Sequence, residues 1–89
     1  MRREPLKIGS VAVSTAGRDE GRRFAVLAEV DAEFVLIANG KLRTVDKPKM
    51  KRRKHLKPTG EVLAEVAARV ENGQRVYDHE LRKWLQEEG

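Results

Sequence analysis

The chain has 89 residues, enough for one small domain. It contains no cysteine, which excludes disulfides and cysteine-based zinc sites and fits a reducing cytoplasm. Its formal net charge of +5 suggests an acidic partner such as nucleic acid. The longest apolar runs are far shorter than the roughly 20 residues that cross a bilayer, and the basic N-terminus lacks the apolar core of a signal peptide, so we expect no membrane partner.

Charge divides the chain into two unlike segments. Residues 1–58 carry 15 Lys and Arg against 7 Asp and Glu, a net charge of +8, whereas residues 59–89 carry 4 against 7, a net charge of −3. A surface that served solubility alone would mix the two signs. We therefore expect residues 1–58 to form the unit that meets a polyanion, and residues 59–89 to form an acidic extension.

Short alternating apolar segments fill the first half of the chain. Their period of two predicts four consecutive strands, over residues 10–14, 24–30, 34–38 and 41–45. The third, FVLIA, is apolar throughout, which indicates a strand buried on both faces. Asn39-Gly40 before the fourth is a strong hairpin signal, because a type I′ turn requires positive φ at both central residues.

A basic segment follows these strands, with seven Lys or Arg between Lys47 and Lys57. Within it, residues 51–56 are a candidate fifth strand, bracketed by Pro48 and Pro58, neither of which suits a central position in a sheet. Five short strands in so small a chain predict a mainly β fold, a compact barrel followed by a helical C-terminus.

The apolar period becomes helical after this segment. Val62, Val66 and Val70 recur every four residues, with Thr59 as the expected N-cap and Asn72-Gly73 as the expected stop.

A second helix is predicted where Leu81, Trp84 and Leu85 share one face, with Asp78 as its cap. Each helix should have about 10 to 12 residues, too few to be stable alone. We therefore expect the two helices to pack as a hairpin on each other or on the barrel, pinned by Trp84 and Tyr77. An alternative is that they form a docking surface for a protein.

The stretch STAGRDEGRRF connects the first two predicted strands. Gly17 and Gly21 permit positive φ, so the loop can turn tightly, and they leave no side chain to keep a nucleic-acid backbone away. Arg18, Arg22 and Arg23 supply planar donors that match phosphate oxygens. The simpler alternative is that the glycines only make a turn and the charged side chains are solvated.

Two acidic residues within this loop, Asp19 and Glu20, do not suit phosphate binding. They are interpreted as solvated, as orienting a neighbouring arginine, or as accepting a hydrogen bond from a base or a 2′-hydroxyl.

The segments IGSVAVSTAGRDEGRRFAVLAEVD, EFVLIANGKLRTV and KHLKPT together resemble a KOW motif, a β-loop-β unit of ribosomal proteins and transcription elongation factors. In this combination they are most similar to the large-subunit ribosomal family L-fourteen-e of archaea and eukaryotes, and to small bacterial KOW-domain RNA-binding proteins. The resemblance covers Ile8 to Thr59, roughly two-thirds of the chain. It implies an SH3-like barrel that binds ribosomal RNA. Residues 60–89 depart from it, so the exact site and role of those relatives are not carried over to this chain, and a protein that acts on some other structured RNA is a further alternative.

The leading hypothesis is a non-enzymatic RNA-binding protein of the ribosomal large subunit, or a cytoplasmic factor associated with the ribosome. The partners expected are structured ribosomal RNA and, through the helices, neighbouring ribosomal proteins. The candidate RNA-binding residues lie in the glycine loop, the predicted fourth strand and the basic segment: Thr15, Gly17, Arg18, Gly21, Arg22, Arg23, Lys41, Arg43, Lys47, Lys49, Lys51, Arg52, Arg53, Lys54, His55 and Lys57.

Several of these candidates have a second interpretation. The basic segment is also typical of a flexible, solvated arm. His55 either stacks on a base or packs on the barrel. Lys41 and Arg43 alternate with apolar residues, which would place them on one face of the fourth strand.

Other functions have weaker support. No phosphate-binding loop, dinucleotide fingerprint or paired-histidine metal motif occurs, so we expect no catalysis, no cofactor and no metal. Aromatic residues are few, and Phe24 and Phe34 are read as core residues rather than as platforms for base stacking. The alternatives are a KOW module that binds a protein of the transcription or translation machinery, and unspecific DNA binding through the basic segment alone.

Overall fold

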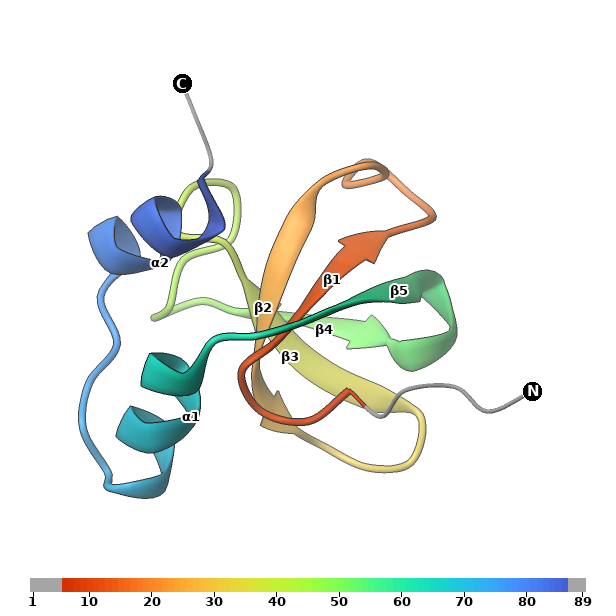
Figure 1. Cartoon of the computed structure of the whole chain (residues 1–89). Coiled ribbons are helices and arrows are strands. Elements are labelled where there is room, and N and C mark those ends of the chain that lie inside the picture. The colour runs from red at the N-terminus through yellow and green to blue at the C-terminus, as the bar shows by residue number, and fades with distance from the viewer. Residues whose placement is uncertain (1–5, 87–89) are drawn as a thin grey trace.

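The computed structural model describes residues 6–86 and shows a twisted antiparallel sheet with two helices on one side (Figure 1). The five strands are β1 (Ser10–Ser14), β2 (Arg23–Glu29), β3 (Phe34–Ala38), β4 (Lys49–Arg52) and β5 (Leu56–Val62), in the spatial order β4-β3-β2-β1-β5. A 3₁₀ turn, Arg53–His55, joins β4 to β5, and helices α1 (Ala64–Glu71) and α2 (Asp78–Leu85) follow. The predicted mainly β fold with a helical C-terminus is confirmed.

Both faces of the central strands are buried, because successive side chains along a strand point to opposite sides. One core lies within the curve of the sheet and consists of Leu6, Ala12, Phe24, Val26, Val35, Ile37 and Leu56. The other lies between the sheet and the helices and consists of Val11, Ala25, Ala38, Val66, Val76, Leu81 and Leu85. Ile37 and Ala38 enter different cores, which confirms that β3 is buried on both faces. Phe24 is a core residue as predicted, whereas Phe34 is half-buried, with the Arg52 guanidinium 5.0 Å from its ring centroid.

The predicted strand over residues 41–45 is wrong, because this segment is a loop and the fourth strand is β4. The Asn39 Oδ1 atom accepts hydrogen bonds from the amides of Lys41 and Arg43, at 3.0 and 3.1 Å. Such local bonds compete with sheet pairing. The Val45 amide then donates to Asp78 Oδ1 at 2.8 Å, which ties the loop to the start of α2. Lys41 and Arg43 therefore do not share a strand face, and Asp78 does not act as the predicted cap.

The fifth strand and the first helix begin later than predicted. β5 runs through Pro58 to Val62, which an edge strand tolerates because one side of it needs no partner. Thr59 is a strand residue whose hydroxyl donates to the Val11 carbonyl at 3.0 Å, not the N-cap of a helix. Val62 is 43% exposed and so lies outside the apolar stripe of α1, in which Val66 is the buried residue.

The two helices have eight residues each and pack on the sheet rather than standing apart. Leu81 and Leu85 are buried as predicted, and half-buried Trp84 lies beneath the Arg69 guanidinium of α1, 5.4 Å from its ring centroid. Tyr77 is 47% exposed and does not pin the helices. Among residues 6–86, neither helix is long and apolar enough to cross a bilayer.

The division of the chain into residues 1–58 and 59–89 stays a prediction. β5 continues across its boundary, and the outer parts of both segments, residues 1–5 and 87–89, lie outside the described residues.

Candidate nucleic-acid interface

The β1–β2 loop, residues 15–22, is a compact turn held by its own backbone. The Gly21 amide donates to the Ser14 carbonyl at 2.8 Å, and the Ser14 amide donates to the Arg22 carbonyl at 3.0 Å. Gly17 and Gly21 adopt φ angles of +80° and +86°, a region that favours glycine. The prediction that these glycines allow a tight turn is confirmed.

One acidic side chain of this loop points into the protein. Asp19 is only 3% exposed, and its Oδ2 atom lies 3.2 Å from Lys49 Nζ and 3.7 Å from the Arg43 guanidinium. Because Lys49 lies in β4 and Arg43 in the β3–β4 loop, the carboxylate joins three segments of the chain. Sequence reasoning allowed that Asp19 orients an arginine, but not one 24 positions away, since no local pattern signals such a pairing.

Lys51 also supports the loop from below. It is buried, and its ammonium group donates to the Ala16 carbonyl at 3.0 Å. Burial, with the neighbouring charges of Lys49 and Arg43, lowers the pKa of Lys51 from 10.5, against the opposing effect of Asp19. Three predicted RNA-binding cations, Arg43, Lys49 and Lys51, are thus engaged beneath the loop.

The outer surface around the loop carries cations that face solvent. The Thr15 amide donates to the His55 carbonyl at 2.9 Å, which brings the 3₁₀ turn beside the loop, and β5 starts there with Lys57 opposite Val13. We call this region the loop-end surface; its predicted site residues are Thr15, Gly17, Arg18, Gly21, Arg22, Lys54, His55 and Lys57. Among residues 6–86, Arg18, Lys54 and Lys57 have no acidic partner, and Arg22 is exposed.

Three other candidates, all arginines, are paired with acidic side chains. Arg23 donates to Glu61 at 2.8 Å and to the Leu85 carbonyl at 3.1 Å, so it links the sheet to α2. Arg52 pairs with Glu33 and Arg53 with Glu29, each at 3.0 Å, beside the β2–β3 turn.

Lys41 and Lys47 are exposed in the β3–β4 loop. The structure therefore divides the basic segment and does not present it as one continuous site.

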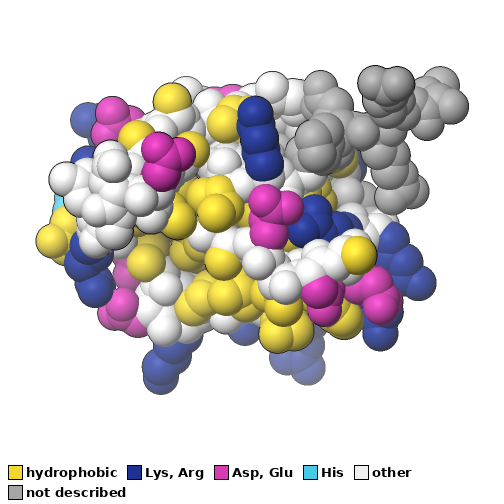
Figure 2. All heavy atoms as spheres, turned by 90° about the horizontal axis from the view of Figure 1, so that it is seen from below, with side chains coloured by type: hydrophobic (Ala, Val, Ile, Leu, Met, Phe, Trp, Pro, Cys, Tyr) yellow, Lys and Arg dark blue, Asp and Glu magenta, His cyan; other side chains and the backbone are white. Residues whose placement is uncertain are grey.

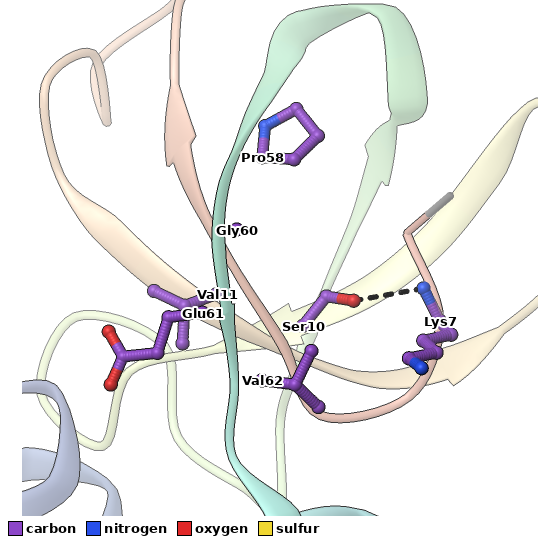
Figure 3. Close-up of a pocket in the computed structure, with 7 residues that line it drawn as sticks. All are labelled: Lys7, Ser10, Val11, Pro58, Gly60, Glu61 and Val62. Atoms are coloured by element: carbon purple, nitrogen blue, oxygen red, sulfur yellow. Dashed lines mark hydrogen bonds between the residues drawn. The ribbon is translucent and has the colours of Figure 1, made fainter. Parts of the chain in front are cut away.

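A shallow pocket of about 150 Å³ opens where the pairing of β1 and β5 shifts register (Figure 3). Its lining is Lys7, Ser10, Val11, Pro58, Gly60, Glu61 and Val62. The Lys7 amide donates to Ser10 Oγ at 3.0 Å, and Glu61 is paired with Arg23. Within residues 6–86 no group of His, Cys, Asp or Glu side chains has the arrangement of a metal site.

Comparison with known proteins finds relatives among archaeal ribosomal proteins, although no family model matches the chain. The large ribosomal subunit protein eL14 of Desulfurococcus amylolyticus is 39% identical over 54 residues, which cover 61% of this chain and 56% of that protein. The protein of the same name from Staphylothermus marinus is 34% identical over 58 residues, or 65% and 60% of the two chains. The chain thus spans less than two-thirds of each relative. The predicted similarity to the family L-fourteen-e is confirmed.

Proposed function

We propose that this chain is a non-enzymatic ribosomal RNA-binding protein of the large-subunit type, acting in the cytoplasm as a ribosomal protein or a ribosome-associated factor. The observation that supports it best is the loop-end surface, where a tight glycine loop presents arginines beside Lys54 and Lys57. The similarity of this chain to two proteins named as large ribosomal subunit proteins also supports the proposal.

Phosphate contacts would supply most of the affinity. Arg18 and Arg22 extend from the loop, and guanidinium groups match phosphate oxygens bidentately. Lys54 and Lys57 add point charges on the same surface. Arg43, Lys49 and Lys51 contribute by supporting the loop from within.

The number of contacts gives a measurable salt dependence. Four phosphate contacts, from Arg18, Arg22, Lys54 and Lys57, correspond to a slope of log affinity against log salt of about −3, at roughly 0.7 to 0.9 per phosphate. A surface that used all seven cations of the basic segment as well would give a slope about twice as steep.

Specificity would come from the shape of a folded RNA. The loop is held by backbone hydrogen bonds and two glycines with positive φ, so it is a rigid projection rather than a flexible arm. Lysine and arginine contacts to phosphate carry no base information, and structured RNA is recognised mainly by its shape and its 2′-hydroxyls.

The test is binding to large-subunit ribosomal RNA across a salt series, for wild type and two variants matched in charge. Arg18→Ala/Arg22→Ala removes two cations from the loop, and Arg75→Ala/Lys83→Ala removes two exposed cations from the helical segment. The loop variant should lose about 100-fold in affinity, or tenfold per charge-assisted contact, and its salt slope should fall by about 1.5. The control should lose about twofold, because screening weakens distant charges. Equal losses in both variants would show that only net charge matters.

A second candidate function, a protein-interaction module, is favoured by exposed apolar side chains. Figure 2 shows hydrophobic side chains gathered on one face of the molecule. Leu36 pairs across the sheet with both Ala28 and Met50, and Met50 is 54% exposed. Competition separates the two functions: structured RNA in excess displaces a partner bound at the loop-end surface, but leaves a protein bound through apolar contacts.

A further inference from the structure

We propose that Asp19 is a positioning residue for RNA binding: its buried carboxylate fixes the β1–β2 loop so that Arg18 and Arg22 face the RNA. This inference rests on the proposed function. It assigns to an acidic residue a favourable role within a surface that binds a polyanion.

Burial and charge indicate that the carboxylate is an anchor. A carboxylate that is removed from water needs cations or hydrogen bonds beside it. Asp19 has Lys49 Nζ at 3.2 Å and the Arg43 guanidinium at 3.7 Å, and these groups belong to different segments. The loop is therefore attached at its middle to β4 and to the β3–β4 loop.

The backbone connects the anchored residue, Asp19, directly to both arginines. Arg18 directly precedes Asp19, and the Arg22 amide donates to the Asp19 carbonyl at 3.0 Å. The Glu20 amide donates to the Gly17 carbonyl at 3.2 Å. Because Asp19 points inward, the side chains beside it, Arg18 and Glu20, are turned to solvent.

If Asp19 is an anchor, neutralising it should change the RNA affinity in the direction opposite to that expected from its charge alone. If every charge in the loop acted only through its field, removing either acidic residue would strengthen RNA binding. If Asp19 positions the arginines, its neutralisation weakens binding, although the protein becomes more basic. Glu20 is the matched control, since it is the next residue, is exposed, and makes no side-chain contact described within residues 6–86.

The experiment measures affinity for large-subunit ribosomal RNA in wild type, Asp19→Asn, Glu20→Gln and Arg18→Ala/Arg22→Ala. We expect Asp19→Asn to lose roughly tenfold, equivalent to one charge-assisted contact, and Glu20→Gln to bind up to about twofold more tightly. Amide exchange at Gly21 and Arg22 should accelerate in Asp19→Asn, while exchange in β2 and β3 stays slow. Asp19→Asn binding as tightly as Glu20→Gln, or more tightly, would overturn the proposal.

A double-mutant cycle separates positioning from a general loss of structure. In the Arg18→Ala/Arg22→Ala background there are no loop arginines to position, so Asp19→Asn should cost no further affinity. A further tenfold loss in that background would contradict the proposal.

A second pair of variants and two contrasting outcomes keep the role of Asp19 testable apart from the proposed function. If the single variant does not fold, Asp19→Asn/Lys49→Met, which removes the closer cation together with the carboxylate, is compared with Lys49→Met and should show the same tenfold loss. If Arg18→Ala/Arg22→Ala binds as wild type does, the proposed function fails together with the inference. If that variant loses binding while Asp19→Asn behaves like Glu20→Gln, only the inference fails.

Discussion

Replacing Gly40 with alanine should destabilise the protein by about 2–5 kcal/mol, because two separate penalties act at this position. Gly40 has a φ of +80°, and a side chain in this region costs roughly 1–2 kcal/mol. A Cβ atom there would also lie 2.3 Å from the Asp78 carbonyl oxygen and 3.2 Å from Arg82 Cγ. Because the first of these is backbone at the start of α2, relief requires the loop and helix to separate, an overpacking cost of about 1–3 kcal/mol.

Gly73→Ala is the matched control for this prediction. Gly73 has a φ of +70°, but a Cβ atom there would meet nothing within 4 Å, so only the conformational penalty of roughly 1–2 kcal/mol remains. The free energy of unfolding is measured by urea denaturation for wild type and both variants. Equal losses in the two variants would refute the reasoning, since they would show that α2 does not press against the β3–β4 loop.

Three further predictions concern the cores and the charged groups. Leu81→Ala, at a fully buried position of α2, should cost about 2–5 kcal/mol in urea denaturation, and a loss below about 1 kcal/mol would mean that α2 is not packed on the sheet. The hydrogen bond from Arg69 lowers the pKa of Glu80 from 4.5, so this pair stabilises the fold above that pH; the stability difference between wild type and Glu80→Gln should shrink as the pH falls below 4.5, and a difference independent of pH would contradict this. Burial lowers the pKa of Lys51 from 10.5, so just below pH 10.5 the unfolded chain binds more protons than the folded protein, and the free energy of unfolding increases as the pH rises there. Lys51→Met should abolish this increase, and an increase that persists in the variant would rule out Lys51 as its source.

Much of the fold could be predicted from local sequence. The strands over residues 10–14 and 24–30 follow from alternation, and the buried strand over residues 34–38 from its continuous apolar run. Asn39-Gly40 also indicated a turn, but not the groups to which the loop after it is hydrogen-bonded. Its Asn39 side chain caps the backbone of residues 41–43, and Asp78, far along the chain, takes the Val45 amide.

The boundary between sheet and helix could not be located from its pattern. Val62, Val66 and Val70 fit a helical stripe, yet Val62 pairs with Ser10 in the sheet. Pro58 pointed away from a central strand, but β5 is an edge strand and tolerates it. Long-range pairing overrode local preference here.

The tight turn of the glycine loop was predicted correctly, whereas the sequence did not show which basic side chains point inward. The basic segment is continuous in sequence, whereas strand alternation turns Lys49 and Lys51 inward and leaves Met50 and Arg52 exposed. The role of Asp19 depends on partners 24 and 30 positions away, which no local motif contains.

Sedimentation with ribosomes from the organism that encodes this chain tests the central claim most directly. Wild type, Arg18→Ala/Arg22→Ala and Arg75→Ala/Lys83→Ala are run on gradients in low and in high salt. Our account predicts that wild type and the helix-side variant sediment with the large subunit in both salts, and that the loop variant is lost from it. Wild type that stays at the top of the gradient even in low salt would contradict the ribosomal function and favour the protein-interaction module instead.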